Sequence, residues 1–262
     1  MNYIRMPFTI LVLIYVLGRR FGFKTLNIWA LGRVKYYGKL GVAYNRIKKN
    51  ANTSVVILMR ELETGKVEER KVAKLQADRL LDLSWREVQE LRHAKFFVVV
   101  RNPYTRVLSA FLDKFRQEVY KEEFRVRPLT PQGFHEFVLW LRRGGQSKDP
   151  HWDLQTKLML LPLSAYDSVI HFEELREQMT EFLVENQLTN SEGVLKDLYP
   201  SDVGKQTSAS ALVNEFYNQD TKRIVDELYK KDFEELGYPM HLELNRAPQV
   251  WATGAQAQGR GG

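Results

Sequence analysis

Two adjacent lysines, Lys48 and Lys49, stand in a short polar loop between an expected strand and an expected helix. The segment 42–47 has the apolar spacing of a strand, and apolar residues at helical spacing follow Thr53 and Ser54. The first turn of a helix has free N–H groups and carries partial positive charge. Because the lysines add charge and the two hydroxyls add donors, this stretch predicts a site for a phosphate or sulfate group.

The loop differs from the phosphate loop of nucleoside triphosphatases, which follows the pattern G-x-x-x-x-G-K-[ST]. That pattern needs glycines so that the backbone can wrap around the phosphates. Here no glycine stands between Gly41 and Gly65. The sequence therefore predicts a different kind of anion-binding loop.

A second stretch with similar chemistry begins about fifty residues later. The continuous apolar run 96–100 predicts a strand buried on both faces of a parallel sheet, and Asn102 with Pro103 predicts the start of a helix. Arg101 at the strand end offers a bidentate fork, and Ser109 offers a hydroxyl donor, so the pair could bind a second phosphate. The helix face expected to be exposed carries Asn102, Arg106, Ser109 and Asp113.

The run R-N-P-Y-T-R-V-L-S-A-F-L-D-K-F, which starts at Arg101, resembles the 3′-phosphate signature of the carbohydrate sulfotransferase family. This family includes chondroitin and dermatan sulfotransferases and bacterial relatives, and the loop 48–54 is similar to its 5′-phosphosulfate loop. The resemblance implies 3′-phosphoadenosine 5′-phosphosulfate (PAPS) as donor, without a metal, and Arg101 and Ser109 as contacts of the 3′-phosphate. The contacts that it implies on the 5′ side are Lys48, Lys49, Asn50, Ala51, Asn52, Thr53 and Ser54.

His151 is the candidate catalytic base. It follows a loop with glycine and proline and opens the motif H-W-x-x-Q, which resembles a segment of the same family. A near-neutral pKa suits a histidine to this role, and Trp152 could form a wall that stacks on a sugar. The alternative is that His151 only shapes the pocket; a carboxylate such as Glu118 or Asp153 would then be the next candidate base.

Lys205 lies in a late loop, Gly204 to Thr207, that resembles a family loop closing over the nucleotide. It is a candidate donor contact, and a solvated lysine is the alternative. Before this loop, the segment 166–172 is expected to be a strand, followed by a helix over 173–186. After it, the segment 213–238 is expected to be one helix.

The chain of 262 residues carries a net charge of +7, which favours anionic partners such as a nucleotide, an acidic glycan or a membrane surface. It contains no cysteine, which fits a reducing compartment. We expect a cytoplasmic location, at the inner face of a membrane if the protein associates with one. Nucleic acid is not an expected partner.

The segment 1–40 is interpreted as a separate leader. Its apolar run 8–17 is shorter than the roughly 20 residues needed to span a bilayer, and aromatic and basic residues follow it. This composition suits either a membrane interface or a helix packed on the domain. The segment 41–242 is expected to be the sulfotransferase domain, and 243–262 a disordered tail rich in Gly, Ala and Gln.

The fold class expected from these features is α/β, with a P-loop-like parallel sheet flanked by helices and strands near 42–47, 96–100 and 167–172. The resemblance implies transfer of a sulfuryl group to a hydroxyl of a carbohydrate or glycolipid, with Lys49 and His151 as catalytic residues. Lys49 would stabilise the bridging oxygen of the donor as that oxygen becomes charged. Two alternatives are a kinase-like nucleotide-binding enzyme and a non-catalytic basic protein at a membrane surface.

Overall fold

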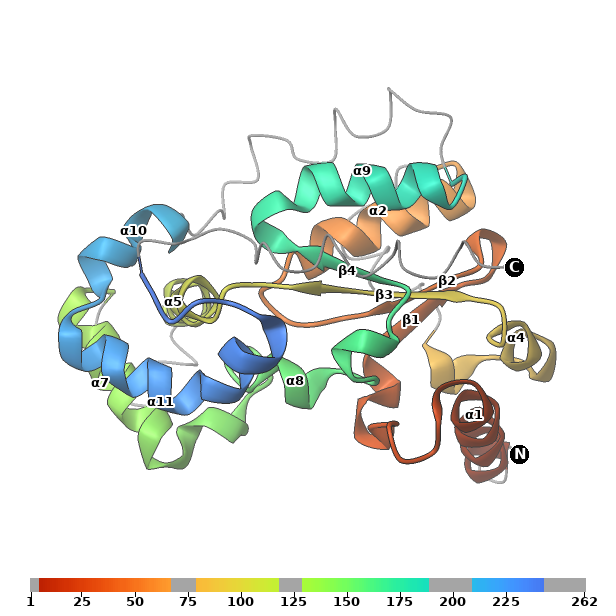
Figure 1. The fold of residues 1–262 in the computed structure, drawn as a ribbon, viewed down its shortest axis with the longest axis horizontal. Coiled ribbons are helices and arrows are strands. Elements are labelled where there is room, and N and C mark those ends of the chain that lie inside the picture. The colour runs from red at the N-terminus through yellow and green to blue at the C-terminus, as the bar shows by residue number, and fades with distance from the viewer. Residues whose placement is uncertain (1–4, 67–78, 118–128, 189–208, 243–262) are drawn as a thin grey trace, which may run out of the picture.

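The computed structural model describes residues 5–66, 79–117, 129–188 and 209–242. A four-stranded sheet with the order β1-β2-β3-β4 lies at its centre (Figure 1). Strands β2, β3 and β4 run parallel, as expected, whereas β1 pairs with β2 in the antiparallel direction. The strands are β1 (Val34–Tyr37), β2 (Val42–Asn45), β3 (Lys95–Val100) and β4 (Ser168–His171).

Strand β1 was not anticipated, and it lies inside the segment 1–40. Its four residues are all buried, and a tight turn ending at Gly41, whose φ is +64°, returns the chain into β2. The aromatic and basic residues 35–37, interpreted above as suited to a membrane interface, are here part of an edge strand. The sheet therefore begins before residue 41.

One face of the sheet is covered by α2 (Asn52–Thr64) and α9 (Leu175–Glu185), which lie side by side above it in Figure 1. Apolar side chains from β2, β3 and β4 pack against the inner faces of these helices. Tyr44 stacks on Phe97, and Phe97 contacts Phe182 of α9. This layer fixes the direction in which α2 leaves the end of β2.

The opposite face carries α1 (Arg5–Phe21), α4 (Trp85–Glu90) and the short α8 (Gln155–Leu158). Helix α4 starts with the expected capping box between Ser84 and Glu87. Leu13, Val16 and Leu17 of α1 belong to the same core cluster as Phe96 of β3. Helix α1 therefore packs on the domain along one of its faces.

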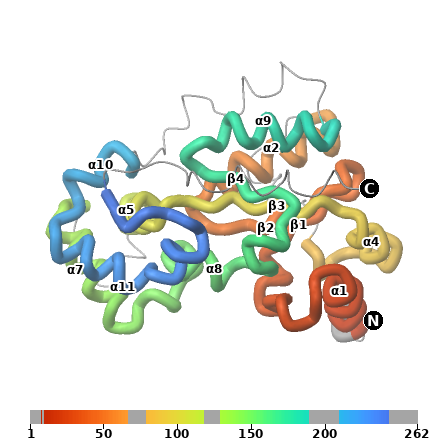
Figure 2. The backbone as a smooth tube through the Cα atoms, viewed as in Figure 1, coloured from red at the N-terminus to blue at the C-terminus, as the bar shows by residue number. Residues whose placement is uncertain are grey.

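Beyond the carboxyl end of β3, α5 (Pro103–Lys114) is surrounded by α7 (Pro131–Trp140), α10 (Ala209–Phe216) and α11 (Gln219–Leu236). Figure 2 shows that the chain returns from distant parts of the sequence to lie beside α5. Every residue from Pro103 to Leu112 is buried. The expectation that Arg106 and Ser109 lie on an exposed helix face was therefore wrong; at Arg106 that face is covered by the loop before α2 and by the segment 150–153.

The expectation of a single helix over 213–238 was also wrong. The chain forms two helices, α10 and α11, separated at Tyr217 and Asn218. The Asn218 side chain accepts a hydrogen bond from the Thr221 backbone N–H at 2.8 Å and caps α11. Because apolar residues at helical spacing continue across residues 217 and 218, the sequence pattern alone does not show that a second helix begins there.

Candidate active site

The loop between β2 and α2 adopts a conformation that usually needs glycine. Lys49 and Ala51 have φ values of +72° and +51°, and Ala51 is the residue from which α2 begins. The left-handed conformation costs an L-residue other than glycine roughly 1–2 kcal/mol. The loop can hold it only because surrounding groups fix it in place.

Asn50 supplies one of these constraints. Its side-chain amide, fully buried, donates hydrogen bonds to the Val99 carbonyl at 2.8 Å and to Gln155 Oε1 at 2.6 Å. These bonds tie the centre of the loop to the end of β3. Asn50 therefore shapes the loop through its side chain.

Two buried arginines of the second motif hold the loop from the other side. Arg101 Nη1 donates to the Lys49 carbonyl at 2.9 Å, and Arg106 Nε donates to the Lys48 carbonyl at 3.1 Å. The two stretches that the sequence predicted as separate phosphate sites are thus in direct contact. They form one candidate site at the carboxyl ends of β2 and β3.

Arg101 has further partners around its guanidinium. Its Nε donates to Thr105 Oγ1 at 3.0 Å, and its guanidinium carbon lies 3.9 Å from the centre of the Phe172 ring. Burial lowers the pKa of Arg101 to about 10, against the opposing effect of Glu173, so the side chain stays charged at neutral pH. Ser109, the other expected contact of the 3′-phosphate, is buried on α5.

The Arg106 side chain makes its hydrogen bonds to backbone carbonyls. It is fully buried, and besides the Lys48 carbonyl it donates to the Asp153 carbonyl at 2.8 Å and to the Pro150 carbonyl at 3.2 Å. Burial lowers its pKa, and the nearby Asp232 opposes this change. Arg106 therefore joins the loop 46–54 to the segment that carries His151.

Lys49 extends its side chain toward the last turn of α5. Its ammonium lies 3.1 Å from the Asp113 carboxylate, and both side chains are largely covered. Burial lowers the pKa of Lys49 to about 8, although Asp113 acts in the opposite direction. Lys49 is thus a desolvated cation paired with Asp113, and its backbone lies in the loop that leads into α2.

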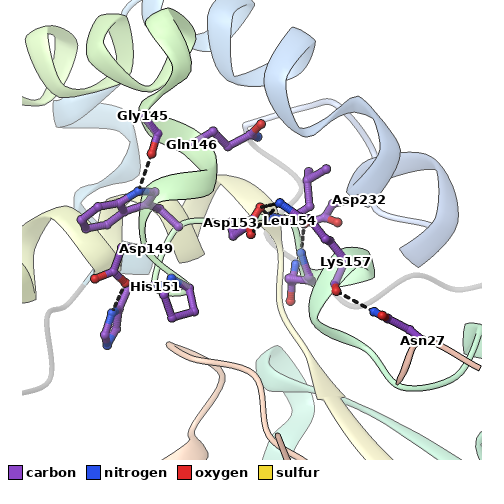
Figure 3. A network of polar contacts seen from close by, with 12 residues as sticks. Asn27, Gly145, Gln146, Asp149, His151, Asp153, Leu154, Lys157 and Asp232 are labelled. Atoms are coloured by element: carbon purple, nitrogen blue, oxygen red, sulfur yellow. Dashed lines mark hydrogen bonds and ion pairs between the residues drawn. The ribbon is translucent and has the colours of Figure 1, made fainter. Parts of the chain in front are cut away.

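His151 lies next to Asp149 in a tight turn, and Figure 3 shows the two side chains pointing toward one another. The imidazole Nδ1 is within hydrogen-bond distance of the Asp149 carboxylate, which also accepts the His151 backbone N–H at 2.8 Å. Burial lowers the pKa of His151, Asp149 acts in the opposite direction, and the charges of Lys114 and Lys48 lower the pKa further. A neutral ring that donates from Nδ1 presents its unprotonated Nε2 as a base.

Trp152 does not form the expected sugar-stacking wall. It is fully buried, its indole N–H donates to the Gly145 carbonyl at 3.0 Å, and its ring packs against Phe137 and Trp140. That expectation was wrong, because the tryptophan anchors the His151 turn in the core.

Gln155 and Asp232 were not identified as site residues from the sequence. Gln155 Oε1 accepts from the Arg101 backbone N–H at 3.0 Å, and its Nε2 donates to the Arg101 carbonyl at 2.7 Å. The buried Asp232 on α11 accepts the Gln155 N–H at 2.8 Å and the Thr156 N–H at 3.0 Å, which fixes α8. The place of Gln155 in the motif H-W-x-x-Q was the available signal, whereas nothing local marked Asp232.

More positive charge gathers at the mouth of the loop than the sequence suggested. Arg33 directly precedes β1 and Arg46 directly follows β2, and the Arg46 backbone N–H donates to the Arg33 carbonyl at 3.0 Å. The Arg46 side chain donates through Nε to Asn52 Oδ1 at 2.8 Å. Burial lowers the pKa of Lys48, and the charges of Arg46, Lys114 and Arg33 lower it further. This mutual repulsion between cations favours an anion beside the first turn of α2, where Thr53 and Ser54 lie.

Lys205 and Glu118 lie outside the described residues, so their roles remain predictions. Within the described ranges, no group of three or more His, Asp or Glu side chains could hold a metal ion. A cavity of about 310 Å³ opens elsewhere, between the segment after α1, α8 and the end of α11. Its lining includes no residue of the loop 46–54 or of α5.

Comparison with known proteins agrees with this arrangement. The model of the Sulfotransferase family matches residues 33–239, which include β1, the loop 46–54, the His151 turn and all of α11. Neither the curated proteins nor the solved structures gave a match. Since the family match covers most of the chain and agrees with the observed α/β fold, the protein belongs to the Sulfotransferase family.

Proposed function

We propose that the protein transfers a sulfuryl group from PAPS to a hydroxyl of a carbohydrate or glycolipid. The observation that carries this proposal is the hydrogen bond from Arg101 to the Lys49 carbonyl, which makes one continuous site from the two anion-binding motifs. A donor with phosphate groups at both its 5′ and 3′ positions fits such a site. A nucleotide without a 3′-phosphate would leave the second motif without its ligand.

The fit on the 5′ side rests on the start of α2. Its first turn offers N–H groups, and Lys48, Lys49 and Arg46 surround it with positive charge. The left-handed Lys49 and Ala51 turn the loop backbone around this point. Arg101 and Ser109 are the proposed contacts of the 3′-phosphate, and Lys205 is a further proposed contact.

The proposed reaction is an in-line displacement at sulfur. The acceptor oxygen forms a bond to sulfur while the bond from sulfur to the bridging oxygen of the donor breaks. His151 Nε2 takes the proton of the acceptor hydroxyl, and Asp149 stabilises the imidazolium that results. Lys49 donates a hydrogen bond to the bridging oxygen as negative charge develops there. Positioning and charge stabilisation supply most of the rate enhancement, as in phosphoryl transfer.

An acceptor screen tests this proposal directly. The protein is incubated with PAPS labelled in its sulfuryl group and with panels of neutral and acidic saccharides and glycolipids. We expect label in at least one class of acceptor with the native protein and transfer at least about 100-fold slower with His151→Ala. Label transferred equally well by both proteins would remove His151 as the base, and transfer from labelled ATP instead would favour a kinase-like enzyme.

We also propose that the outer face of α1 rests on an anionic membrane surface, which would place the enzyme at the cytoplasmic side of a membrane. Phe8, Leu11 and Tyr15 share one helix face and are 63%, 65% and 55% exposed. Trp85 stacks on Phe8 at 6.4 Å, and Phe23 lies 6.5 Å from Tyr15, so the apolar patch extends beyond the helix. No helix in the described part of the chain is long and apolar enough to cross a bilayer.

Charge supports a lipid surface as the occupant of this face. Arg19 continues the same stripe and is exposed, and α1 contains no acidic residue. Aromatic and aliphatic side chains bordered by cations suit the boundary between acyl chains and anionic headgroups. Because the inner face of α1 is part of the core, deleting residues 1–17 would remove core residues as well as the patch.

Substitutions on the outer face therefore give a cleaner test. The double variant Leu11→Ser/Tyr15→Ser should lose sedimentation with phosphatidylglycerol vesicles while its unfolding temperature stays near that of the native protein. Val184→Ser, at an exposed apolar position on α9, is the matched control and should sediment normally. Equal sedimentation of the native protein and the double variant would contradict the proposal.

A further inference from the structure

The ion pair between Lys49 and Asp113 is not explained by anion binding alone. Asp113 lies in the last turn of α5, three turns beyond Arg101, and its Oδ2 is 3.1 Å from Lys49 Nζ. Lys49 thus has its backbone carbonyl fixed by Arg101 and its ammonium fixed by Asp113, two residues of the same motif. The second motif therefore contacts Lys49 both at its backbone carbonyl and at its side-chain ammonium.

The groups around Lys49 show why a carboxylate matters at this position. Burial is the main reason that the Lys49 pKa falls to about 8, and the charges of Arg101 and Lys114 lower it further. Asp113 is the group that raises it. Without Asp113, a larger fraction of Lys49 would be neutral at physiological pH, and a neutral amine stabilises a developing anion poorly.

Asp113 itself is poorly suited to act as a base. Burial alone would raise the pKa of Asp113, but the nearby Lys49, Lys114 and His151 more than offset this and hold that pKa below its usual range. A carboxylate with a lowered pKa accepts protons less readily than the neutral His151. The environment therefore fits a fixed negative charge.

We propose that Asp113 is a positioning residue for Lys49: its carboxylate pairs with the Lys49 ammonium and fixes where this charge lies between the loop and α5, ready for the bridging oxygen of the donor. This inference rests on the proposed function for the role of Lys49. An ammonium has three N–H donors, so Lys49 can keep its bond to Asp113 while it donates to a bound ligand. Asp113 makes no contact with the reacting atoms in this account.

The first test needs no donor and no acceptor. The pKa of Lys49 is measured by ¹³C NMR of lysine labelled at Cε, with Lys49→Arg used to assign its signal. We expect the Lys49 pKa in Asp113→Asn to fall by about one unit below that of the native protein, because one opposite charge within hydrogen-bond distance has been removed. Asp113→Glu should restore most of the difference.

The matched control is Glu227→Gln on α11, which removes a carboxylate from an exposed pair with Arg223. This variant should leave the Lys49 pKa unchanged. The same Lys49 pKa in Asp113→Asn and in the native protein would overturn the inference, whatever the protein transfers. Thermal unfolding establishes that each variant is folded, and Asp113→Ser replaces Asp113→Asn if the latter is not.

The second test uses the reaction. Turnover requires charged Lys49, so activity falls as pH rises through the pKa of Lys49 in the donor complex. Lowering that pKa in Asp113→Asn should move the alkaline limb of the turnover profile to lower pH by about one unit, with a smaller change in KM for the donor. Loss of turnover by the same factor at every pH would mean that Asp113 only supports the fold.

Discussion

The loop 46–54 and helix α5 both carry residues expected to bind the donor, yet they use their charges differently. The loop carries Arg46, Lys48 and Lys49 just before α2; Lys49 is paired with Asp113, and the charges of Arg46, Lys114 and Arg33 lower the pKa of Lys48. In the second motif, Arg101 and Arg106 are buried and donate to carbonyls of the loop. In the proposed site the loop provides charge for the 5′ side of the donor, whereas the second motif holds the loop backbone and also offers Arg101 and Ser109 to the 3′-phosphate.

This difference explains how a loop without glycine can bind an anion. A glycine-rich loop reaches left-handed conformations without steric cost, whereas Lys49 and Ala51 reach them only under restraint. Asn50, Arg101 and Arg106 supply that restraint through their side chains. Substitutions can separate the charges proposed to contact the donor from the charges that hold the loop backbone. Their expected effects decrease in the order given.

The largest effect is expected for His151→Ala, which removes the proposed base. Turnover should fall by about 10²–10⁴ with little change in donor affinity. Since the pKa of His151 lies below its usual value and the ring must be neutral to act, native activity should be lost as pH falls through that pKa. This acid limb should be missing in the variant, and His151→Gln should be no more active, because an amide cannot accept the proton.

Lys49→Ala should lower turnover by about 10²–10³, the range for removing one donor to a developing anion. Donor affinity should change much less, because the lysine contributes most when the bridging oxygen becomes charged. Turnover and calorimetric affinity are measured on the same preparation. Near-native turnover would place the catalytic charge elsewhere and remove the contrast between the loop and α5.

Arg106→Ala should act on stability. It leaves the buried carbonyls of Lys48, Pro150 and Asp153 without their charged donor, at a cost of about 3 kcal/mol or more in the free energy of unfolding. Urea denaturation measures this change. Arg223→Ala removes an exposed arginine from α11 and should change the free energy by less than about 1 kcal/mol. Equal values for both variants would show that α5 does not support the loop in this way.

The smallest effect is expected for Ser109→Ala, which removes one hydroxyl from the proposed 3′-phosphate site. Affinity for 3′-phosphoadenosine 5′-phosphate should fall about five- to tenfold, and affinity for adenosine 5′-phosphosulfate should not change. Arg101→Ala is a less selective test, because Arg101 also holds the Lys49 carbonyl. Equal losses for both nucleotides would show that Ser109 supports the fold and does not contact the 3′-phosphate.

Local patterns were sufficient to predict the parallel strands β2, β3 and β4, the start of α5 at Asn102 and Pro103, and the loop with Lys49. These features depend on neighbouring residues: apolar runs, caps and a helix N-terminus. The antiparallel β1 was missed because its short run of aromatic and basic residues resembles a membrane interface. Its burial depends on pairing with β2, which the run itself does not reveal.

The errors at the site have a common physical cause. Arg106 and Ser109 fall on the polar side of α5 by helical spacing, and Trp152 follows a loop, so each was interpreted as accessible. Arg106 is covered by the loop 46–54 and the segment 150–153, and Trp152 packs against α7 and Phe115. Gln155 was missed for the same reason, because its partners Asn50, Arg101 and Asp232 come from three separate segments. Asp232 was missed because its partners Gln155 and Thr156 lie far away in the sequence.

The most direct test of the account is calorimetry on the native protein with 3′-phosphoadenosine 5′-phosphate, compared with adenosine 5′-phosphate and with ATP. A site that joins the loop to Arg101 and Ser109 should bind the nucleotide with both phosphates at least about tenfold more tightly than either of the others, since a charged hydrogen bond contributes roughly 1.5–3 kcal/mol. Equal or weaker binding of 3′-phosphoadenosine 5′-phosphate, with ATP preferred, would contradict it.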